Sequence, residues 1–125
     1  MKLDKKILVI DDSATVRQQV RIAFAGKGFE IIEANDGVEG FEAITRCEQL
    51  AAVICDVNMP RMDGLQLLRL VKSQQHLATL PVLMLTTEAQ PALVKQAKES
   101  GAKGWLVKPF KPEQLVATIQ RLTAS

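Results

Sequence analysis

The sequence predicts an α/β fold, in which a doubly wound parallel sheet of five strands is covered by helices on both faces. Short, continuously apolar runs, typical of strands buried on both faces, alternate with segments whose apolar residues follow the helical period. Each strand and helix pair takes about 20 to 25 residues, which suits one parallel crossover unit. The 125 residues, 47% hydrophobic and 24% charged, suit one globular domain, so we expect a single domain over residues 1–125.

The expected strands differ in how apolar they are. Residues 7–10, 51–55 and 82–85 are short buried runs, and residues 104–107 form a weaker one. Residues 29–34 contain two glutamates, so we expect an edge strand there.

The segments between these runs carry apolar residues at helical spacing. Gly26 and Gly28 follow the first stripe and Gly101 follows the fourth as stop signals. Pro91 and Pro112 stand where a first helical turn tolerates proline. The stripes are Val16, Val20 and Phe24; Val38, Phe41, Ile44 and Cys47; Leu65, Leu68 and Val71; Leu93, Val94 and Ala97; and Leu115, Val116, Ile119 and Leu122.

Composition excludes several classes of function. A net charge of +2 and the lack of tyrosine, with four Phe and one Trp, argue against nucleic-acid binding. No stretch approaches the roughly 20 apolar residues of a membrane helix, and the N-terminal apolar run is too short for a signal peptide. Cys47 and Cys55 lack metal-ligand spacing with His76, so we expect two buried thiols, a reducing compartment and an exposed loop histidine. The sequence therefore predicts a cytoplasmic protein that binds neither nucleic acid nor membrane.

Polar residues stand at the ends of four expected strands. In a sheet of order 2-1-3-4-5, the winding reverses between strands one and three, and the functional crevice opens there at the carboxyl ends. We therefore expect these polar side chains to converge. They are Asp11 and Asp12 after the first strand, Asp56 after the third, Thr86 and Thr87 after the fourth, and Lys108 after the fifth.

Three aspartates at one site require compensation of their charge. If Asp11, Asp12 and Asp56 lie about 5 Å apart, each pair repels by roughly 3 kcal/mol at an effective dielectric near 20. Either one carboxylate takes a proton or a cation neutralises them, and hard oxygens with room for water suit Mg2+. Lys108 supplies a further positive charge from the far side.

These residues favour phosphoryl transfer onto a carboxylate. Asp56 ends the central strand opposite the other two aspartates, so we expect it to accept the phosphoryl group, with Lys108 and Thr86 contacting the phosphoryl oxygens. Taken singly, Asp12 also fits a helix cap and Lys108 a solvated loop residue. Their occurrence together at strand ends favours a site. The glycine-rich nucleotide-binding motifs do not occur.

The motifs that carry these residues resemble a known family. They are the acidic pair in residues 10–13, the segment 56–64, Thr86, and Lys108 with the Pro and Phe that follow it. Over nearly the whole chain they closely resemble the receiver domain of two-component response regulators, in particular stand-alone chemotaxis regulators of the CheY kind. The resemblance implies a flavodoxin-like sheet and a phosphoryl group transferred from a histidine kinase to Asp56.

The resemblance also implies roles that the chemistry alone does not assign. The backbone carbonyl of Asn58 would complete the protein ligands of Mg2+ beside the three aspartates. Asn58 and Glu88 occupy positions that tune the lifetime of the phosphoryl group. Trp105 stands where the family usually has Tyr, Phe or His, the aromatic residue that turns inward on activation.

The sequence thus predicts a signalling switch that changes its affinity for a partner protein. Met1 suggests a natural start, so we expect no attached output domain, although a piece of a longer regulator stays an open alternative. We also expect a monomer, and a target that is a flagellar motor switch, a pilus apparatus or a phosphorelay component. We expect no enzymatic activity beyond assistance to its own phosphorylation and dephosphorylation. Two alternatives stay open: a hydrolase that turns over through an aspartyl phosphate, and an unphosphorylated adaptor that uses the fold for docking.

Four lysines near Trp105 predict a surface for that partner. An ordinary solvated surface is the alternative. The residues are Lys95 and Lys98 on the fourth helix, Lys103 beside the last strand and Lys111 before the last helix.

Overall fold

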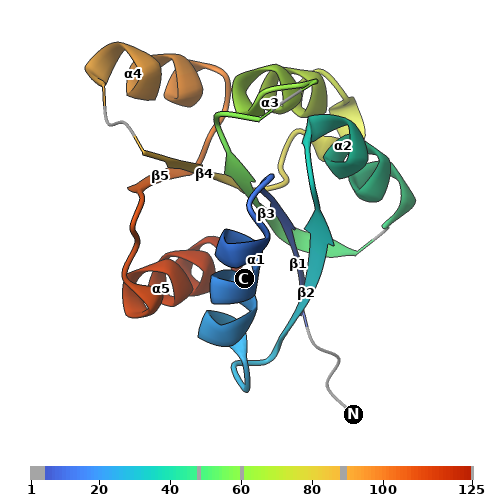
Figure 1. The fold of residues 1–125 in the computed structure, drawn as a ribbon. Coiled ribbons are helices and arrows are strands. Elements are labelled where there is room, and N and C mark those ends of the chain that lie inside the picture. The colour runs from blue at the N-terminus through green and yellow to red at the C-terminus, as the bar shows by residue number, and fades with distance from the viewer. Residues whose placement is uncertain (1–4, 48, 60, 88–89, 125) are drawn as a thin grey trace.

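The computed structural model describes residues 5–47, 49–59, 61–87 and 90–124 (Figure 1). Five parallel strands form one sheet in the order β2-β1-β3-β4-β5, which confirms the predicted fold class and strand order. Asp56 and Thr86 are the last residues of their strands, so the sheet itself fixes their backbone. The strands are β1 (Lys5–Ile10), β2 (Phe29–Ala34), β3 (Leu50–Asp56), β4 (Val82–Thr86) and β5 (Gly104–Val107).

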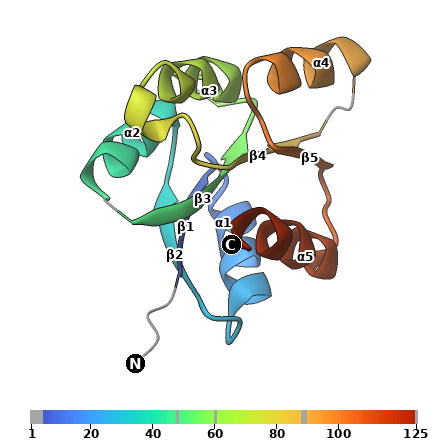
Figure 2. The same ribbon diagram turned by 180° about the vertical axis from the view of Figure 1, so that it is seen from behind.

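Helices cover both faces of the sheet, as predicted. Figures 1 and 2 show α1 and α5 side by side on one face, and α2, α3 and α4 on the other. A short 3-10 turn, Gln75–Leu77, leads into β4. The helices are α1 (Ala14–Phe24), α2 (Gly37–Arg46), α3 (Gly64–Lys72), α4 (Pro91–Glu99) and α5 (Pro112–Thr123).

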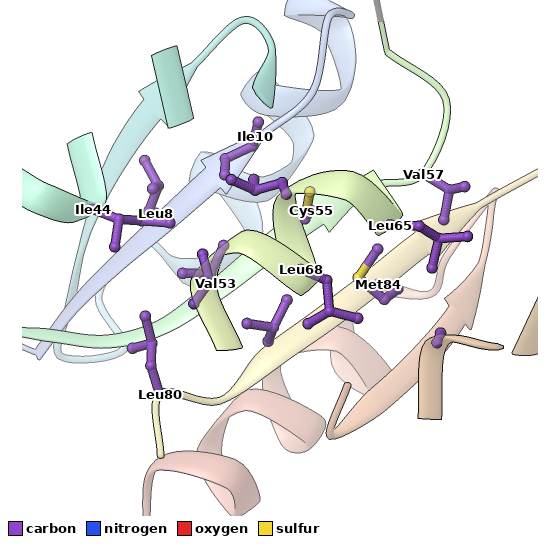
Figure 3. Close-up of a cluster of buried hydrophobic side chains, with 14 of the residues drawn as sticks. Leu8, Ile10, Ile44, Val53, Cys55, Val57, Leu65, Leu68, Leu80 and Met84 are labelled. Carbon is purple, nitrogen blue, oxygen red and sulfur yellow. The ribbon is translucent and has the colours of Figure 1, made fainter. Parts of the chain in front are cut away.

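The sheet separates two apolar cores, because alternate side chains of each strand point to opposite faces. β1, β3 and β4 are covered on both sides, which explains why their sequences are apolar without alternation. The core under α2, α3 and α4 contains strand residues Leu8, Ile10, Val53, Cys55 and Met84 (Figure 3). The core under α1 and α5 contains strand residues Ile7, Val9, Ile54, Leu83 and Leu85.

The chain returns tightly from β3 into α3. A Cβ atom on Gly64 would overlap the carbonyl oxygen of Asp56, so only glycine allows α3 to begin this close to the end of β3. The Gly64 amide donates to the Val57 carbonyl oxygen at 2.8 Å. The two ends of the β3–α3 loop therefore meet at the carboxyl edge of the sheet, and the described residues of this loop are 57–59 and 61–63.

One prediction outside the site was wrong. Cys55 is buried in β3, as expected, but Cys47 is only half-buried. The reason is that α2 ends at Arg46, so Cys47 no longer continues the apolar stripe of that helix. His76 is exposed, as predicted. In the described part of the chain, no helix has the length and apolar character needed to cross a bilayer.

Candidate functional site

The predicted polar residues meet at the carboxyl edge of the sheet. Asp11 follows β1 and Thr86 ends β4, and both are fully buried. Asp56, at the end of β3, is 5% exposed, whereas Asp12 is exposed. Because parallel strands end at the same edge, residues far apart in sequence form one site.

Three carboxylates form a cluster suited to a hard cation. Asp11, Asp12 and Asp56 each offer one oxygen, and these three oxygens lie within 4.8 Å of one another. One of the three residues is exposed, so water can reach the cluster. Mg2+ prefers oxygen ligands and keeps several of its waters, so the donor set and its partial exposure fit this ion.

Lys108 lies between two of these carboxylates. Its Nζ is 2.7 Å from Asp11 Oδ2 and 3.3 Å from Asp56 Oδ1, and the side chain is 15% exposed. The backbone holds it there, because the Lys108 amide donates to the Thr86 carbonyl oxygen at 2.6 Å. Burial opposes the charged form of Lys108, but the hydrogen bond and negative charge of Asp11, followed by those of Asp56, raise its pKa overall.

Asp56 combines burial with strong charged neighbours. Burial, and then the negative charge of Asp11, raise the pKa of Asp56 above its ordinary value, although Lys108 and the Asn58 amide act in the opposite direction. The Asn58 amide donates to Asp56 Oδ1 at 3.3 Å, so Lys108 and Asn58 contact the same oxygen. Three carboxylates beside a single ammonium leave two negative charges uncompensated, which a divalent cation would balance.

Arg17 is a contributor that the sequence did not predict. Its Nη1 donates to the Asp11 carbonyl oxygen at 2.5 Å, and its Nε lies 3.0 Å from Glu33 Oε1. The Ser13 amide donates to Asp11 Oδ1 at 2.9 Å, so both the backbone and the side chain of Asp11 are held. A charged residue on an expected helix has many possible partners, and only the packing of α1 on β2 selects Glu33 and Asp11.

Trp105 is already packed inward. It lies opposite Met84 in the β4–β5 register and packs against the core under α2, α3 and α4. Its Nε1 is buried and, within the described residues, has no hydrogen-bond partner. The indole is thus partly buried in this structure, so a change of conformation at Trp105 would start from an inward-packed ring.

The remaining predicted residues are exposed lysines and one residue outside the part of the chain that the structure describes. Glu88 lies outside the described residues. Lys95 is exposed and lies 3.9 Å from Glu99, a weak surface pair. The other three lysines of the predicted partner surface are also exposed, and they are Lys98, Lys103 and Lys111.

Two hollows adjoin the site without enclosing its aspartates. The smaller has a volume of about 210 Å³ and reaches Lys108 and Thr87. The larger, of about 560 Å³, lies between α1 and α5 and shares Gln19, Pro109 and Phe110 with the smaller one. The smaller hollow therefore reaches the Lys108 side of the site.

The position and chemistry of this cluster define a class of protein. Sheets of this topology bind their ligands where the winding reverses, between β1 and β3. Carboxylates, an ammonium and a hydroxyl at that point suit transfer of a phosphoryl group to aspartate. The fold and the site thus define a phosphoryl-accepting signalling domain.

The chain belongs to the response regulator receiver domain family, whose model matches residues 7–120. It is 37% identical over 111 residues to a chemotaxis protein CheY homolog of Campylobacter jejuni, covering 88% of this chain and 85% of that one. It is 38% identical over 111 residues to chemotaxis protein CheY1 of Helicobacter pylori, covering 88% and 90%. The structure of Vibrio cholerae chemotaxis protein CheY4 matches with a TM-score of 0.89 and 40% identity, over 95% of this chain and 98% of that one.

The protein is thus a CheY-like response regulator receiver, which confirms the predicted family and the phosphoryl-accepting switch. Proteins of this kind are signalling proteins rather than classical enzymes. Membership also implies an upstream histidine kinase and a downstream target.

Proposed function

We propose that Asp56 accepts a phosphoryl group from the phosphohistidine of a kinase and that the phosphorylated protein changes its affinity for a target protein. The observation that carries this proposal is the position of Lys108, whose Nζ contacts Asp11 and Asp56 together. A cation in this position can hold the oxygens of a phosphoryl group that arrives on Asp56. We also propose a cytoplasmic location, where a histidine kinase could phosphorylate the protein.

The transfer step uses groups already in place. Lys108 and Asn58 contact Oδ1 of Asp56, so we expect Oδ2 to attack the phosphorus. The new O–P bond forms as the P–N bond to the donor imidazole breaks, and the imidazole nitrogen keeps the electron pair. Lys108 and the Thr86 hydroxyl would then contact the phosphoryl oxygens. Mg2+ held by Asp11, Asp12, Asp56 and the Asn58 carbonyl would supply further neutralisation of charge on the transferring group.

The residue two places after Asp56 argues against the hydrolase alternative. A hydrolase that turns over on small phosphoesters needs a general acid for the leaving group, and Asn58 stands two residues after Asp56, where such an acid would be expected. The hollows beside the site do not enclose the aspartates, which suits a phosphoryl group presented by another protein. We propose that the protein assists only its own phosphorylation and dephosphorylation.

Intact-mass spectrometry tests the proposal. Incubation with acetyl phosphate and Mg2+ should add one phosphoryl group per chain, and EDTA should prevent the addition because the carboxylates would repel the anionic donor. An unchanged mass under both conditions would favour the adaptor alternative. Many turnovers on an added phosphoester would favour the hydrolase.

Trp105 should report phosphorylation through its fluorescence. Thr86 and Trp105 lie on neighbouring strands, and Thr86 is paired with Val107 in the same register that sets Trp105 opposite Met84. If Thr86 moves towards a phosphoryl group on Asp56, the packing of the indole should change with it. We expect acetyl phosphate to shift Trp105 emission and iodide quenching only when Mg2+ is present.

Two variants control this measurement. Asp56→Asn should give no shift, and Thr86→Ala should give a smaller one while still being phosphorylated. If the wild type is phosphorylated and its emission and quenching stay constant, the Trp105 side chain does not change its conformation on phosphorylation.

Charge reversal on α4 should slow binding of an acidic target. We propose that Lys95, Lys98, Lys103 and Lys111, exposed around the β5 edge, form the partner surface. Lys95→Glu with Lys98→Glu should lower the association rate about tenfold at low salt and weaken its salt dependence, because attraction would be replaced by repulsion. Stopped-flow mixing with the target protein measures this rate.

A matched double reversal far from α4 provides the control. Lys27→Glu with Arg46→Glu makes the same change of net charge at exposed residues beside β2 and at the end of α2. It should affect the rate much less. Equal rates for the two double variants would leave the α4 lysines as ordinary solvated charge.

A further inference from the structure

We infer that Arg61 is a positioning residue whose ion pair with Asp36 fixes the β3–α3 loop and thereby sets the affinity of the acidic cluster for a divalent cation. The inference rests on the proposed function in taking Asp11, Asp12 and Asp56 as the cation site. Asp36 precedes α2 and Arg61 lies in the loop that leaves the end of β3.

The pair joins a buried carboxylate to an exposed guanidinium. Nε and Nη2 of Arg61 lie 2.8 and 2.6 Å from Asp36 Oδ2. Oδ1 of Asp36 accepts a hydrogen bond from the Glu39 amide at 2.9 Å and so caps α2. The hydrogen bond from Glu39 and the interactions with Arg61 hold the pKa of Asp36 below its ordinary value despite burial. Both oxygens of a buried, ionised carboxylate are thus engaged.

The backbone at Arg61 indicates that the loop is held in a costly conformation. Its φ is +68°, the left-handed region, and among the described non-glycine residues Arg61 alone has a positive φ. Such a conformation persists in a residue with a side chain only where surrounding contacts compensate for it. The two contacts with Asp36 are compensation of this kind.

A second contact joins the same two segments. A Cβ atom on Gly37, the first residue of α2, would lie 2.5 Å from the Met62 carbonyl oxygen and 2.7 Å from Met62 Cβ. Glycine therefore lets the loop rest directly on the start of α2. Figures 1 and 2 both show α2 beside α3, which begins where this loop ends. Two consecutive loop residues, Arg61 and Met62, thus touch the same end of α2.

The loop held in this way also carries groups of the acidic site. The Asn58 amide donates to Asp56 Oδ1, and the Gly64 amide closes the loop on Val57. Among the described loop residues, 57–59 and 61–63, Arg61 makes the one ion pair to another element. A short closed loop has few free dihedral angles, so release of Arg61 should also change the conformation at Asn58.

A titration with Mg2+ followed by 1H–15N NMR tests the inference in the full chain. Arg61→Asn removes the guanidinium but keeps a residue that tolerates a positive φ. Asp36→Asn removes the charge but keeps a good cap for α2. We expect each single variant to lower the affinity for Mg2+ about threefold or more. The double variant should lower it no further than the more affected single variant does, because both substitutions break the same link.

The sign of the Arg61→Asn effect separates positioning from plain electrostatics. Loss of a positive charge near a cation site should strengthen Mg2+ binding if charge alone matters, whereas loss of the anchor should weaken it. Arg46→Asn, at an exposed residue at the end of α2, is the matched control and should leave the affinity unchanged. Affinity of Arg61→Asn within twofold of the wild type, or tighter, would overturn the inference.

Amide hydrogen exchange without Mg2+ gives an independent readout. In both single variants the amides of Asn58 and Gly64 should exchange faster, while those of β1 should not change, which separates release of the loop from general destabilisation. A wild type that binds no Mg2+ would overturn the cation site itself. A wild type that binds Mg2+ with unchanged single variants would overturn only the role of Arg61.

Discussion

Replacement of Asp56 by asparagine is expected to abolish phosphorylation. Under conditions where the wild type gains one phosphoryl group from acetyl phosphate and Mg2+, Asp56→Asn should be labelled at least about a hundredfold more slowly, because an amide is a poor nucleophile. Intact-mass spectrometry measures the loss, and peptide mapping of the wild type should locate the label on Asp56. A label acquired by Asp56→Asn at the wild-type rate would refute the assignment.

Unfolding should not account for this loss. Burial and the charge of Asp11 raise the pKa of Asp56, which means that the fold favours a neutral side chain at this position. Asp56→Asn should therefore unfold at the same temperature as the wild type or a higher one at pH 7. Asp63→Asn is the matched control, since Asp63 caps α3 from the end of the same loop and asparagine caps a helix equally well. It should keep normal labelling.

The composition of the acidic cluster was predictable because each of its members borders a buried strand. Four apolar runs locate the strand ends, and parallel strands bring those ends to one edge of the sheet. The positions of Asp11, Asp56 and Thr86 could therefore be predicted from the local sequence pattern and the strand order alone. The contact of Lys108 Nζ with Asp11 Oδ2 could be predicted from the same strand order and the attraction of opposite charges.

The supports of the cluster were not predictable, because they depend on the packing of elements against each other. Arg61 and Asp36 meet only when α2 rests on the β3–α3 loop, and arginine gives no sequence signal for the positive φ that it adopts. Arg17 reaches the Asp11 carbonyl oxygen only through the packing of α1 against β1 and β2. Trp105 was correctly placed in β5, but the burial of its Nε1 follows from side-chain packing around β4 and β5.

Replacement of Lys108 by alanine should separate phosphorylation from its effect on the target. In the structure Lys108 neutralises Asp11 and Asp56 together, and once Asp56 carries a phosphoryl group its ammonium would turn to the phosphoryl oxygens. Without it, we expect phosphorylation to slow about tenfold and most of the phosphorylation-dependent gain in target affinity to disappear, a gain on the order of 5- to 150-fold for such couplings. Fluorescence anisotropy of labelled target, with and without acetyl phosphate, measures the gain.

The choice of replacement tests what Lys108 contributes. Lys108→Ala leaves two buried carboxylates without their cation, so its free energy of unfolding in EDTA should fall by about 3 kcal/mol. Mg2+ should restore part of that loss, because it would supply the missing charge, and the coupling should still be absent in this stabilised protein. Lys108→Arg keeps the positive charge, so its free energy of unfolding should be close to that of the wild type. A planar guanidinium does not reproduce the ammonium contacts at 2.7 and 3.3 Å, so the phosphorylation-dependent gain in target affinity should be restored less fully. If Lys108→Ala in Mg2+ is phosphorylated and its target affinity rises as in the wild type, Lys108 serves only to balance charge, and the signal must leave Asp56 by another residue.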